Sequence, residues 1–213
     1  MKIVLASNNP GKLVELQAMF TPLGCTLVPQ GELGVPEAPE PYRSFVENAL
    51  TKARNAAQHT GLPALADDAG LCVDAFGGLP GVDTAYYATQ FGYAKGDDNN
   101  VRALLEQMHD ISNRRAAMVS VLVAVRSADD PEPLIAMGRV VGQIAREPTG
   151  SNGFGFDPVM WIPEFGQTFA QLPTEVKNAN SHRGRSAKAM SALIREHWMA
   201  LSLIHISEPT RPY

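Results

Sequence analysis

Two long runs of β-branched and aliphatic residues constrain the fold of this chain more than any other feature. They occupy residues 116–125 and 134–144, and the turn-forming residues 127–133 separate them. This pattern predicts a long β-hairpin. An apolar run at residues 2–6 is followed by a helical pattern at residues 12–23, which predicts a crossover connection as well. The two kinds of connection together indicate an α/β fold with a mixed sheet.

The clearest helix follows a proline-rich loop. Ser44 and Glu47 form a capping-box pattern, and Phe45 and Ala49 follow at helical spacing. We therefore expect a helix over residues 44–60. The other expected elements are strands at residues 26–29 and 62–66 and helices at residues 99–108 and 185–201.

Composition narrows the class of protein. The 213 residues carry a formal net charge of −4, whereas a general nucleic-acid-binding protein shows a basic surplus. No stretch approaches the ~20 apolar residues of a membrane span, and the first apolar run is too short for a signal-peptide core. The chain has only two cysteines, Cys25 and Cys72, which is too few for a metal cluster or a disulfide framework, and we expect both in the core. We therefore expect a cytoplasmic protein that binds neither nucleic acid nor membrane.

The last segment does not fit the rest of the chain. Residues 202–213 follow a predicted helix that has already completed its apolar face, and they resemble translated sequencing-adapter sequence. A genuine disordered tail is the alternative. We expect one domain over residues 1–201 and a non-native tail over residues 202–213.

Two polar clusters suit a phosphate and a metal ion. Residues 7–12 (Ser-Asn-Asn-Pro-Gly-Lys) form a turn between a strand and a helix, where backbone N–H groups and a lysine favour an anion, although a plain helix N-cap explains them equally well. Asp67 and Asp68 are expected at a strand end, where they would bind magnesium and polarise a water; the alternative is a solvated turn. Glu37, Glu40 and Glu47 lie in or after the proline-rich loop and are candidates for a further carboxylate.

Two later clusters suit a purine base. Glycines flank Phe154 within residues 150–158, so the backbone can approach a flat ligand while the ring offers a stacking face. The alternative is a tight β-turn with a phenylalanine in the core. Lys177 and residues 181–185 (Ser-His-Arg-Gly-Arg) are rich in donors, unless they are only a solvated basic helix start. The four clusters together match the parts of a nucleoside triphosphate, with water as the attacking group because no nucleophile is evident.

The order of these motifs resembles the inosine/xanthosine triphosphate pyrophosphatase family over nearly all of residues 1–200. The matching segments are Ser-Asn-Asn-Pro-Gly-Lys at 7–12, Phe-Val-Glu-Asn-Ala at 45–49, Ala-Asp-Asp-Ala-Gly-Leu at 66–71, Gly-Leu-Pro-Gly-Val at 78–82, Arg-Glu-Pro at 146–148, Gly-Phe-Gly-Phe-Asp-Pro at 153–158 and Lys-Asn-Ala-Asn-Ser-His-Arg-Gly at 177–184.

The resemblance implies an elongated two-lobed α/β fold, with a central mixed sheet flanked by helices and a substrate cleft between the lobes. It also implies a cytoplasmic, magnesium-dependent homodimer that hydrolyses ITP, dITP and XTP to the monophosphate and pyrophosphate. The alternative is a nucleotide-binding module with little or no turnover.

The family pattern assigns roles to individual residues. Asp68 is the catalytic carboxylate and a magnesium ligand, with Glu37 or Glu40 as the second acidic ligand. Ser7, Asn8, Asn9, Pro10, Gly11 and Lys12 bind the triphosphate; Phe154, Gly155, Phe156 and Asp157 form the base-stacking loop; and Lys177, His182 and Arg183 contact the base.

Two positions depart from the family pattern. Ala69 stands where a Ser or Thr is common, so a hydroxyl contact to the substrate is missing, at a cost on the order of 1 kcal/mol. Tyr86 stands where the family often has an arginine, which puts any phosphate-binding or dimer-supporting role of that position in doubt.

Overall fold

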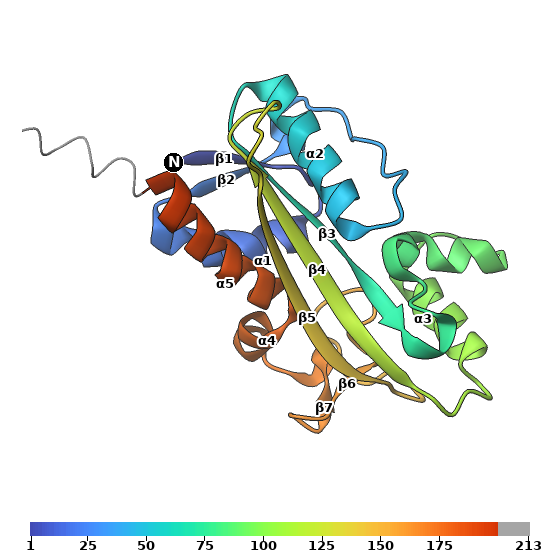
Figure 1. Ribbon diagram of the computed structural model, residues 1–213. Helices are drawn as coiled ribbons and strands as arrows, with labels where there is room; N and C mark the ends of the chain where they lie inside the picture. The colour runs from blue at the N-terminus through green and yellow to red at the C-terminus, as the bar shows by residue number, and fades with distance from the viewer. Residues whose placement is uncertain (200–213) are drawn as a thin grey trace, which may run out of the picture.

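The computed structural model describes residues 1–199, which form one seven-stranded sheet covered by helices. Figure 1 shows the long strands crossing the whole molecule. The strands are β1 (Lys2–Leu5), β2 (Thr26–Pro29), β3 (Ala64–Val73), β4 (Arg115–Val125), β5 (Leu134–Ile144), β6 (Met160–Ile162) and β7 (Gln167–Thr168). The α-helices are α1 (Pro10–Phe20), α2 (Phe45–Thr60), α3 (Asp97–Gln107), α4 (Thr174–Asn180) and α5 (His182–Ile194).

The sheet is mixed, as both connection types in the sequence predict. Its order is β2-β1-β3-β4-β5-β6-β7. The first strand pairs parallel with β2 and β3, whereas every later neighbouring pair is antiparallel. The predicted hairpin is confirmed as β4 and β5, whose register runs from Arg115 opposite Gln143 to Ala124 opposite Leu134.

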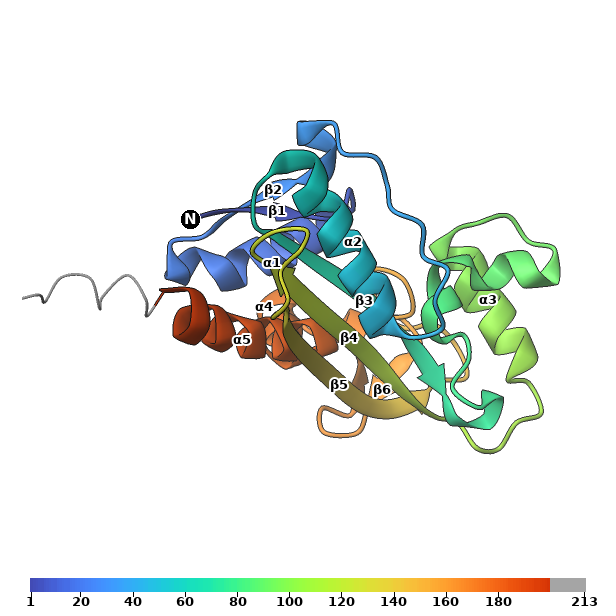
Figure 2. The same ribbon diagram turned by 45° about the horizontal axis from the view of Figure 1, so that its top comes forward.

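Helices cover both faces of the sheet (Figures 1 and 2). On one face α2 packs on β3 and β4, and its buried side chains Ala49, Ala53 and Ala56 are small enough to let it lie close to the strands. On the other face α1 and α5 pack against each other and α5 lies on β4 and β5. Leu16, Phe20 and Met190 fill this second core.

A third core lies at the far end of β3, β4 and β5. There the 3-10 helical segment Gly81–Phe91 packs on β3 and α3 packs on that segment, as the green region of Figure 2 shows. Leu71, Leu104, Phe156 and Phe169 are fully buried in this core. The long central strands thus connect two lobes: one is built around the first two cores, and the distal lobe is built around the third. On the α5 side of the sheet, a polar stretch separates the second core from the third.

The structure corrects two expected boundaries. β3 does not end at Ala66 but continues to Val73, because it pairs with β4 along its whole length. The last helix begins at His182, since the Ser181 side chain caps it by accepting from the Gly184 N–H, and it ends at Ile194 before a π-helical turn.

Four elements had no clear sequence signal: β6, β7, α4 and the segment Gly81–Phe91. They are short or 3-10 helical, so neither periodicity is long enough to stand out. The proposed non-native residues 202–213 lie outside the described residues, as do residues 200–201 of the expected last helix. Within residues 1–199, no helix is long and apolar enough to span a bilayer.

Candidate active site

The adjacent carboxylates Asp67 and Asp68 lie inside β3, and this corrects the expectation that they follow a strand. Successive side chains of a strand point to opposite faces of the sheet. Asp67 accordingly faces α5 and α1, whereas Asp68 faces α2. Both are buried, at 1% and 6% exposure, so the alternative of a solvated turn is wrong. Their mutual repulsion is relieved because each finds its own cation on its own face.

Asp67 is the centre of a buried ionic network. Its carboxylate lies 3.0 Å from the Lys12 ammonium and 3.1 Å from the Arg183 guanidinium, and the Ser120 hydroxyl donates to it at 2.7 Å. Burial alone would raise the pKa of Asp67, but the two cations and the hydroxyl outweigh burial and hold the pKa well below its usual range. Asp67 is therefore a permanent anion that positions Lys12 and Arg183.

Asp68 is in a different environment. Lys52 Nζ of α2 lies 2.8 Å from its carboxylate, and Asn48 Nδ2 donates to it at 3.5 Å. Glu40 shares the same ammonium at 3.2 Å. Burial raises the pKa of Asp68 and the charge of Glu40 adds to this, although Lys52 opposes it. A carboxylate with a raised pKa is suited to accept a proton from water near neutral pH.

The turn at residues 7–12 positions the start of α1. Asn9 caps the helix by accepting from the Lys12 N–H at 3.1 Å, and Pro10 occupies the first helical turn. Ser7 Oγ accepts from the Asn9 N–H at 3.1 Å. The capping interpretation is thus confirmed. It is compatible with anion binding, because the same geometry aims the helix N-terminus at the space beside Lys12.

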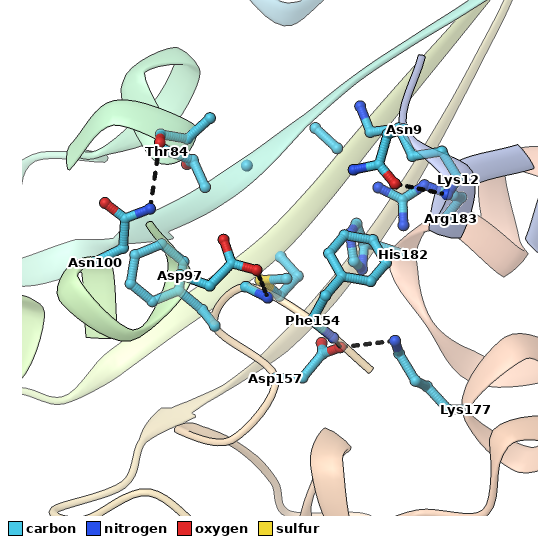
Figure 3. A pocket seen from close by; sticks show the side chains of 16 residues that line it. Asn9, Lys12, Thr84, Asp97, Asn100, Phe154, Asp157, Lys177, His182 and Arg183 are labelled. Atoms are coloured by element: carbon cyan, nitrogen blue, oxygen red, sulfur yellow. Dashed lines mark hydrogen bonds and ion pairs between the residues drawn. The ribbon is translucent and has the colours of Figure 1, made fainter. Parts of the chain in front are cut away.

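A cavity of about 240 Å³ opens between the two lobes (Figure 3). Asn9 and Lys12 form one end of it, while Ala69, Thr84 and Asn100 belong to the other lobe. The remaining walls are Gly70, Ala85, Asp97, Met118, Phe154, Gly155, Phe156, Asp157, Lys177, His182 and Arg183.

Ion pairs hold the donors of this cavity in place. Lys177 Nζ lies 2.7 Å from Asp157 and 3.2 Å from Glu15, and Arg183 lies 2.7 Å from the other Glu15 oxygen. Their cationic groups lie 5.1 and 5.4 Å from the centre of the Phe154 ring. Lys177 and Arg183 are each 4% exposed, so the alternative of a solvated basic helix start is wrong.

His182 lies beside them without a full set of partners. Its side chain is 4% exposed, and Nδ1 has no hydrogen-bond partner among the described residues. Burial lowers its pKa well below the usual value, and the charge of Arg183 lowers it further. A neutral imidazole with an unpartnered nitrogen therefore borders the cavity.

Residues 153–157 divide between ligand-facing and structural roles. Phe156 is 1% exposed and packs into the core of the distal lobe, as the β-turn alternative expects for a phenylalanine of this loop. Phe154 is only half-buried and faces the cavity (Figure 3). Asp157 supports the loop by accepting from the Phe154 N–H at 2.9 Å. Gly155 N–H donates to Asp97 at the start of α3 at 2.9 Å, which ties this loop to α3 beside the cavity.

A second cavity of about 270 Å³ continues from the first, sharing Asn9 and Lys12 with it. Its other walls are Ala6, Ser7, Asn8, Gln30, Glu37, Ala38, Glu40, Lys52, Asp67, Tyr86 and Lys95. We call these two adjoining cavities together the groove; buried donors and an aromatic ring lie at one end of it, and lysines and carboxylates lie at the other.

Three carboxylates expected at a metal do not gather into one cluster. No group of three His, Cys, Asp or Glu residues suited to a metal occurs within residues 1–199. Glu37 instead accepts from Asn8 Nδ2 at 3.2 Å. Glu40 and Asp68 do converge, since both lie within 3.2 Å of the Lys52 ammonium. Two carboxylates around one positive charge fit magnesium, which takes one or two carboxylates and completes its shell with water and phosphate.

The structure therefore brings most of the expected site residues together, with some exceptions. Pro10 and Gly11 border neither cavity, and Gly11 lies beneath the Phe154 ring. Asp68 reaches the second cavity only through its partner Lys52. The residues that the sequence did not single out are Glu15, Lys52, Lys95, Asp97 and Ser120.

Comparisons with known proteins agree with this geometry. The Ham1 family matches residues 3–193. A dITP/XTP pyrophosphatase of Albidiferax ferrireducens is 79% identical over 93% of this chain and 100% of its own length. The corresponding protein of Paracidovorax citrulli is 77% identical over the same shares.

Solved structures show the same fold. A HAM1 protein from Coxiella burnetii superposes with a TM-score of 0.85 at 43% identity, covering 92% of this chain and 99% of that one. The Ham1 protein of Staphylococcus aureus gives 0.81 at 34% identity over the same shares. On the family match, the sequence identity and the shared fold, this chain belongs to the Ham1 family.

Proposed function

We propose that this protein hydrolyses non-canonical purine nucleoside triphosphates, such as dITP, ITP and XTP, to the monophosphate and pyrophosphate. The observation that carries the proposal is the groove of two adjoining cavities. Asn9 and Lys12 join a base-sized cavity lined by Phe154, Lys177 and Arg183 to a cavity lined by lysines and carboxylates. The Albidiferax relative, which is 79% identical, bears the name dITP/XTP pyrophosphatase.

The base end favours a purine with an oxygen at position 6. Hypoxanthine and xanthine present an acceptor there, whereas adenine presents an amino donor. Lys177 and Arg183 are donor-only side chains, so they can satisfy the oxygen but not the amino group. Opposite adenine, the N–H groups that the ion pairs of Lys177 and Arg183 leave free would lack an acceptor. A buried polar group left unpaired costs about 1–3 kcal/mol, which disfavours adenine. The ring of Phe154 adds a stacking surface for any purine.

The phosphate end supplies charge and a base. Lys12, next to the N-terminus of α1, offsets negative charge on the phosphates. Asp68 takes a proton from water, whose oxygen attacks the α-phosphorus while the bond from that phosphorus to the α–β bridging oxygen breaks and pyrophosphate leaves. Asp68 and Glu40 are the residues that would hold Mg²⁺, which supplies positive charge along the triphosphate when bound.

A nucleotide-binding module without turnover is the alternative raised by Ala69 and Tyr86. Ala69 borders the base cavity and offers no hydroxyl there. The relatives named pyrophosphatases, at 70–79% identity, favour turnover instead. A cytoplasmic location and a homodimer remain part of the proposal, and light scattering on the purified protein tests the dimer.

A substrate panel tests the function. With Mg²⁺, the protein should release pyrophosphate from dITP, ITP and XTP far faster than from ATP, and chelation of the metal should stop the reaction. Asp68→Asn should reduce kcat on dITP by at least 100-fold, within the range typical of a general base. Equal rates in the wild type and the variant would reject an enzymatic role for this site. Faster hydrolysis of ATP than of dITP would reject the proposed base recognition.

A further inference from the structure

Lys95 and Tyr86 form a pair at the phosphate end of the groove that has no role in the reaction described above. Tyr86 belongs to the segment Gly81–Phe91, and Lys95 follows it in the loop before α3. The Lys95 ammonium lies 4.2 Å from the centre of the Tyr86 ring. Both side chains are exposed, and both line the second cavity together with Lys12 and Lys52.

The charges of the second cavity single out Lys95. Its walls hold three lysines (Lys12, Lys52 and Lys95) and three acids (Glu37, Glu40 and Asp67). Two of the lysines are already neutralised, since Lys12 pairs with Asp67 and Lys52 pairs with Glu40 and Asp68. Among residues 1–199, Lys95 has no carboxylate partner within ion-pair distance. It is the lysine of this cavity whose charge no carboxylate of the described residues offsets.

The ring of Tyr86 explains how this ammonium is held. A cation over an aromatic face is attracted by the ring quadrupole, and this attraction needs no carboxylate or other oxygen acceptor. Because the attraction uses no hydrogen-bond acceptor, the donors stay free for phosphate oxygens. The pair thus orients a lysine at an exposed position, where side-chain entropy would otherwise weaken its contribution.

The position of the pair along the groove identifies the anion. Lys95 and Tyr86 border the second cavity and not the first, whereas Phe154, Lys177 and Arg183 border the first and not the second. Asn9 and Lys12 lie between them and border both. A nucleotide with its base at Phe154 and its first phosphates at Lys12 extends its terminal phosphates toward Lys95.

We propose that Lys95, oriented by the Tyr86 ring, binds the terminal phosphates of the substrate and the pyrophosphate that leaves. This proposal deepens the proposed function and rests on it for the direction of the nucleotide. The ligand that Lys95 would bind is a diphosphate group. Lys95 is a binding residue for that group and lines the second cavity but not the first.

The test measures binding of inorganic pyrophosphate and of dIMP by isothermal titration calorimetry in the presence of Mg²⁺. Lys95→Gln should weaken pyrophosphate binding by about 5- to 20-fold, which is less than a buried charge-assisted hydrogen bond would give because the site is exposed to screening. Binding of dIMP, which lacks the terminal phosphates, should change less than about twofold. On dITP, the loss should appear mainly as a raised KM.

Matched variants separate the proposal from a general charge effect. Lys188→Gln removes an exposed lysine of α5 outside both cavities and should leave pyrophosphate binding unchanged. Tyr86→Phe keeps the ring and should bind pyrophosphate like the wild type, whereas Tyr86→Leu should bind it about 2- to 5-fold more weakly, as expected for an exposed cation–π contact.

Three results would overturn the proposal: equal pyrophosphate affinity in the wild type and Lys95→Gln, an equal loss in Lys188→Gln, or an equal loss of dIMP binding in Lys95→Gln. Failure of the proposed function gives a different pattern. In that case the wild type would not hydrolyse dITP, while Lys95→Gln would still weaken pyrophosphate binding selectively.

Discussion

Replacing each of the two neighbouring aspartates by asparagine should have very different consequences for the free energy of unfolding. Asp67 has a side-chain exposure of 0% and accepts from Lys12, Arg183 and Ser120 at 2.7 to 3.1 Å. Removing one partner of a buried ionic network costs about 3–5 kcal/mol. Arg183 keeps Glu15 at 2.7 Å, so we expect Asp67→Asn to lose about 3 kcal/mol, the lower end of that range. The free energy of unfolding of a natural domain is typically only about 5–15 kcal/mol, so this loss is a large fraction of it.

Asp68→Asn should instead change the free energy of unfolding by less than about 1 kcal/mol, because burial already disfavours the charged form of this side chain. Lys52 keeps Glu40 as an ion partner in that variant. Turnover should nevertheless be lost, since asparagine cannot accept the proton from water. Stability and activity should therefore separate at two adjacent positions of one strand.

The pH dependence of unfolding follows from the two pKa shifts. The pKa of Asp67 is lowered on folding, so its stabilisation is complete above the unfolded value of about 3.9 and is lost as the pH falls below it toward the folded pKa. The pKa of Asp68 is raised, so its charged form destabilises the folded state at neutral pH and this penalty disappears on acidification. The gap between the wild type and Asp67→Asn should thus narrow below about pH 4.

Urea denaturation at pH 7 and at a pH well below 4, with dITP turnover measured at pH 7 on the same preparations, checks this prediction. The reasoning fails if Asp67→Asn is as stable as the wild type at pH 7. It also fails if Asp68→Asn is the less stable of the two variants.

Further predictions concern the base end and the strand. Phe154→Ala should raise KM for dITP by about 10-fold from the lost stacking, whereas Phe154→Tyr should not; steady-state kinetics on both variants checks this. His182 is buried with a lowered pKa, so kcat/KM for dITP should show no histidine titration between pH 6 and 8, and stability should fall as the pH drops below the unfolded value of about 6.5. Gly70→Ala places a Cβ against the Gly81 carbonyl oxygen and should cost about 3 kcal/mol in thermal unfolding; a cost below 1 kcal/mol would show that the segment can yield. Deleting residues 202–213 should leave dITP turnover unchanged, and a large loss would show that these residues belong to the protein.

Most of the fold was predictable because its main elements carry strong periodic signals. The strands β4 and β5 match the expected runs closely, and Ser44 does cap α2, accepting from the Glu47 N–H at 3.4 Å. The sequence predicts too short a strand for β3, because the two aspartates and the glycine that follow Ala66 are poor strand formers. Pairing with β4 and the ionic partners on each face override that local preference.

The sequence motifs predicted which segments form the site, but not the contacts that hold the side chains in place. The residues of the turn at 7–12 and the donors Lys177 and Arg183 stand out as polar clusters in the sequence. Glu15 and Lys52 lie within amphipathic helices, where a charged residue is ordinarily a solvated one. Only the packing of α1 on α5 and of α2 on β3 shows that they hold the donors and Asp68.

The most direct test of one groove that holds base and phosphates is a crystal structure of Asp68→Asn with dITP and Mg²⁺. The base should lie on Phe154 within hydrogen-bond distance of Lys177 or Arg183, with the phosphates along Lys12 toward Lys95. A base bound at the phosphate end, or a nucleotide bound outside the two cavities, would contradict the account.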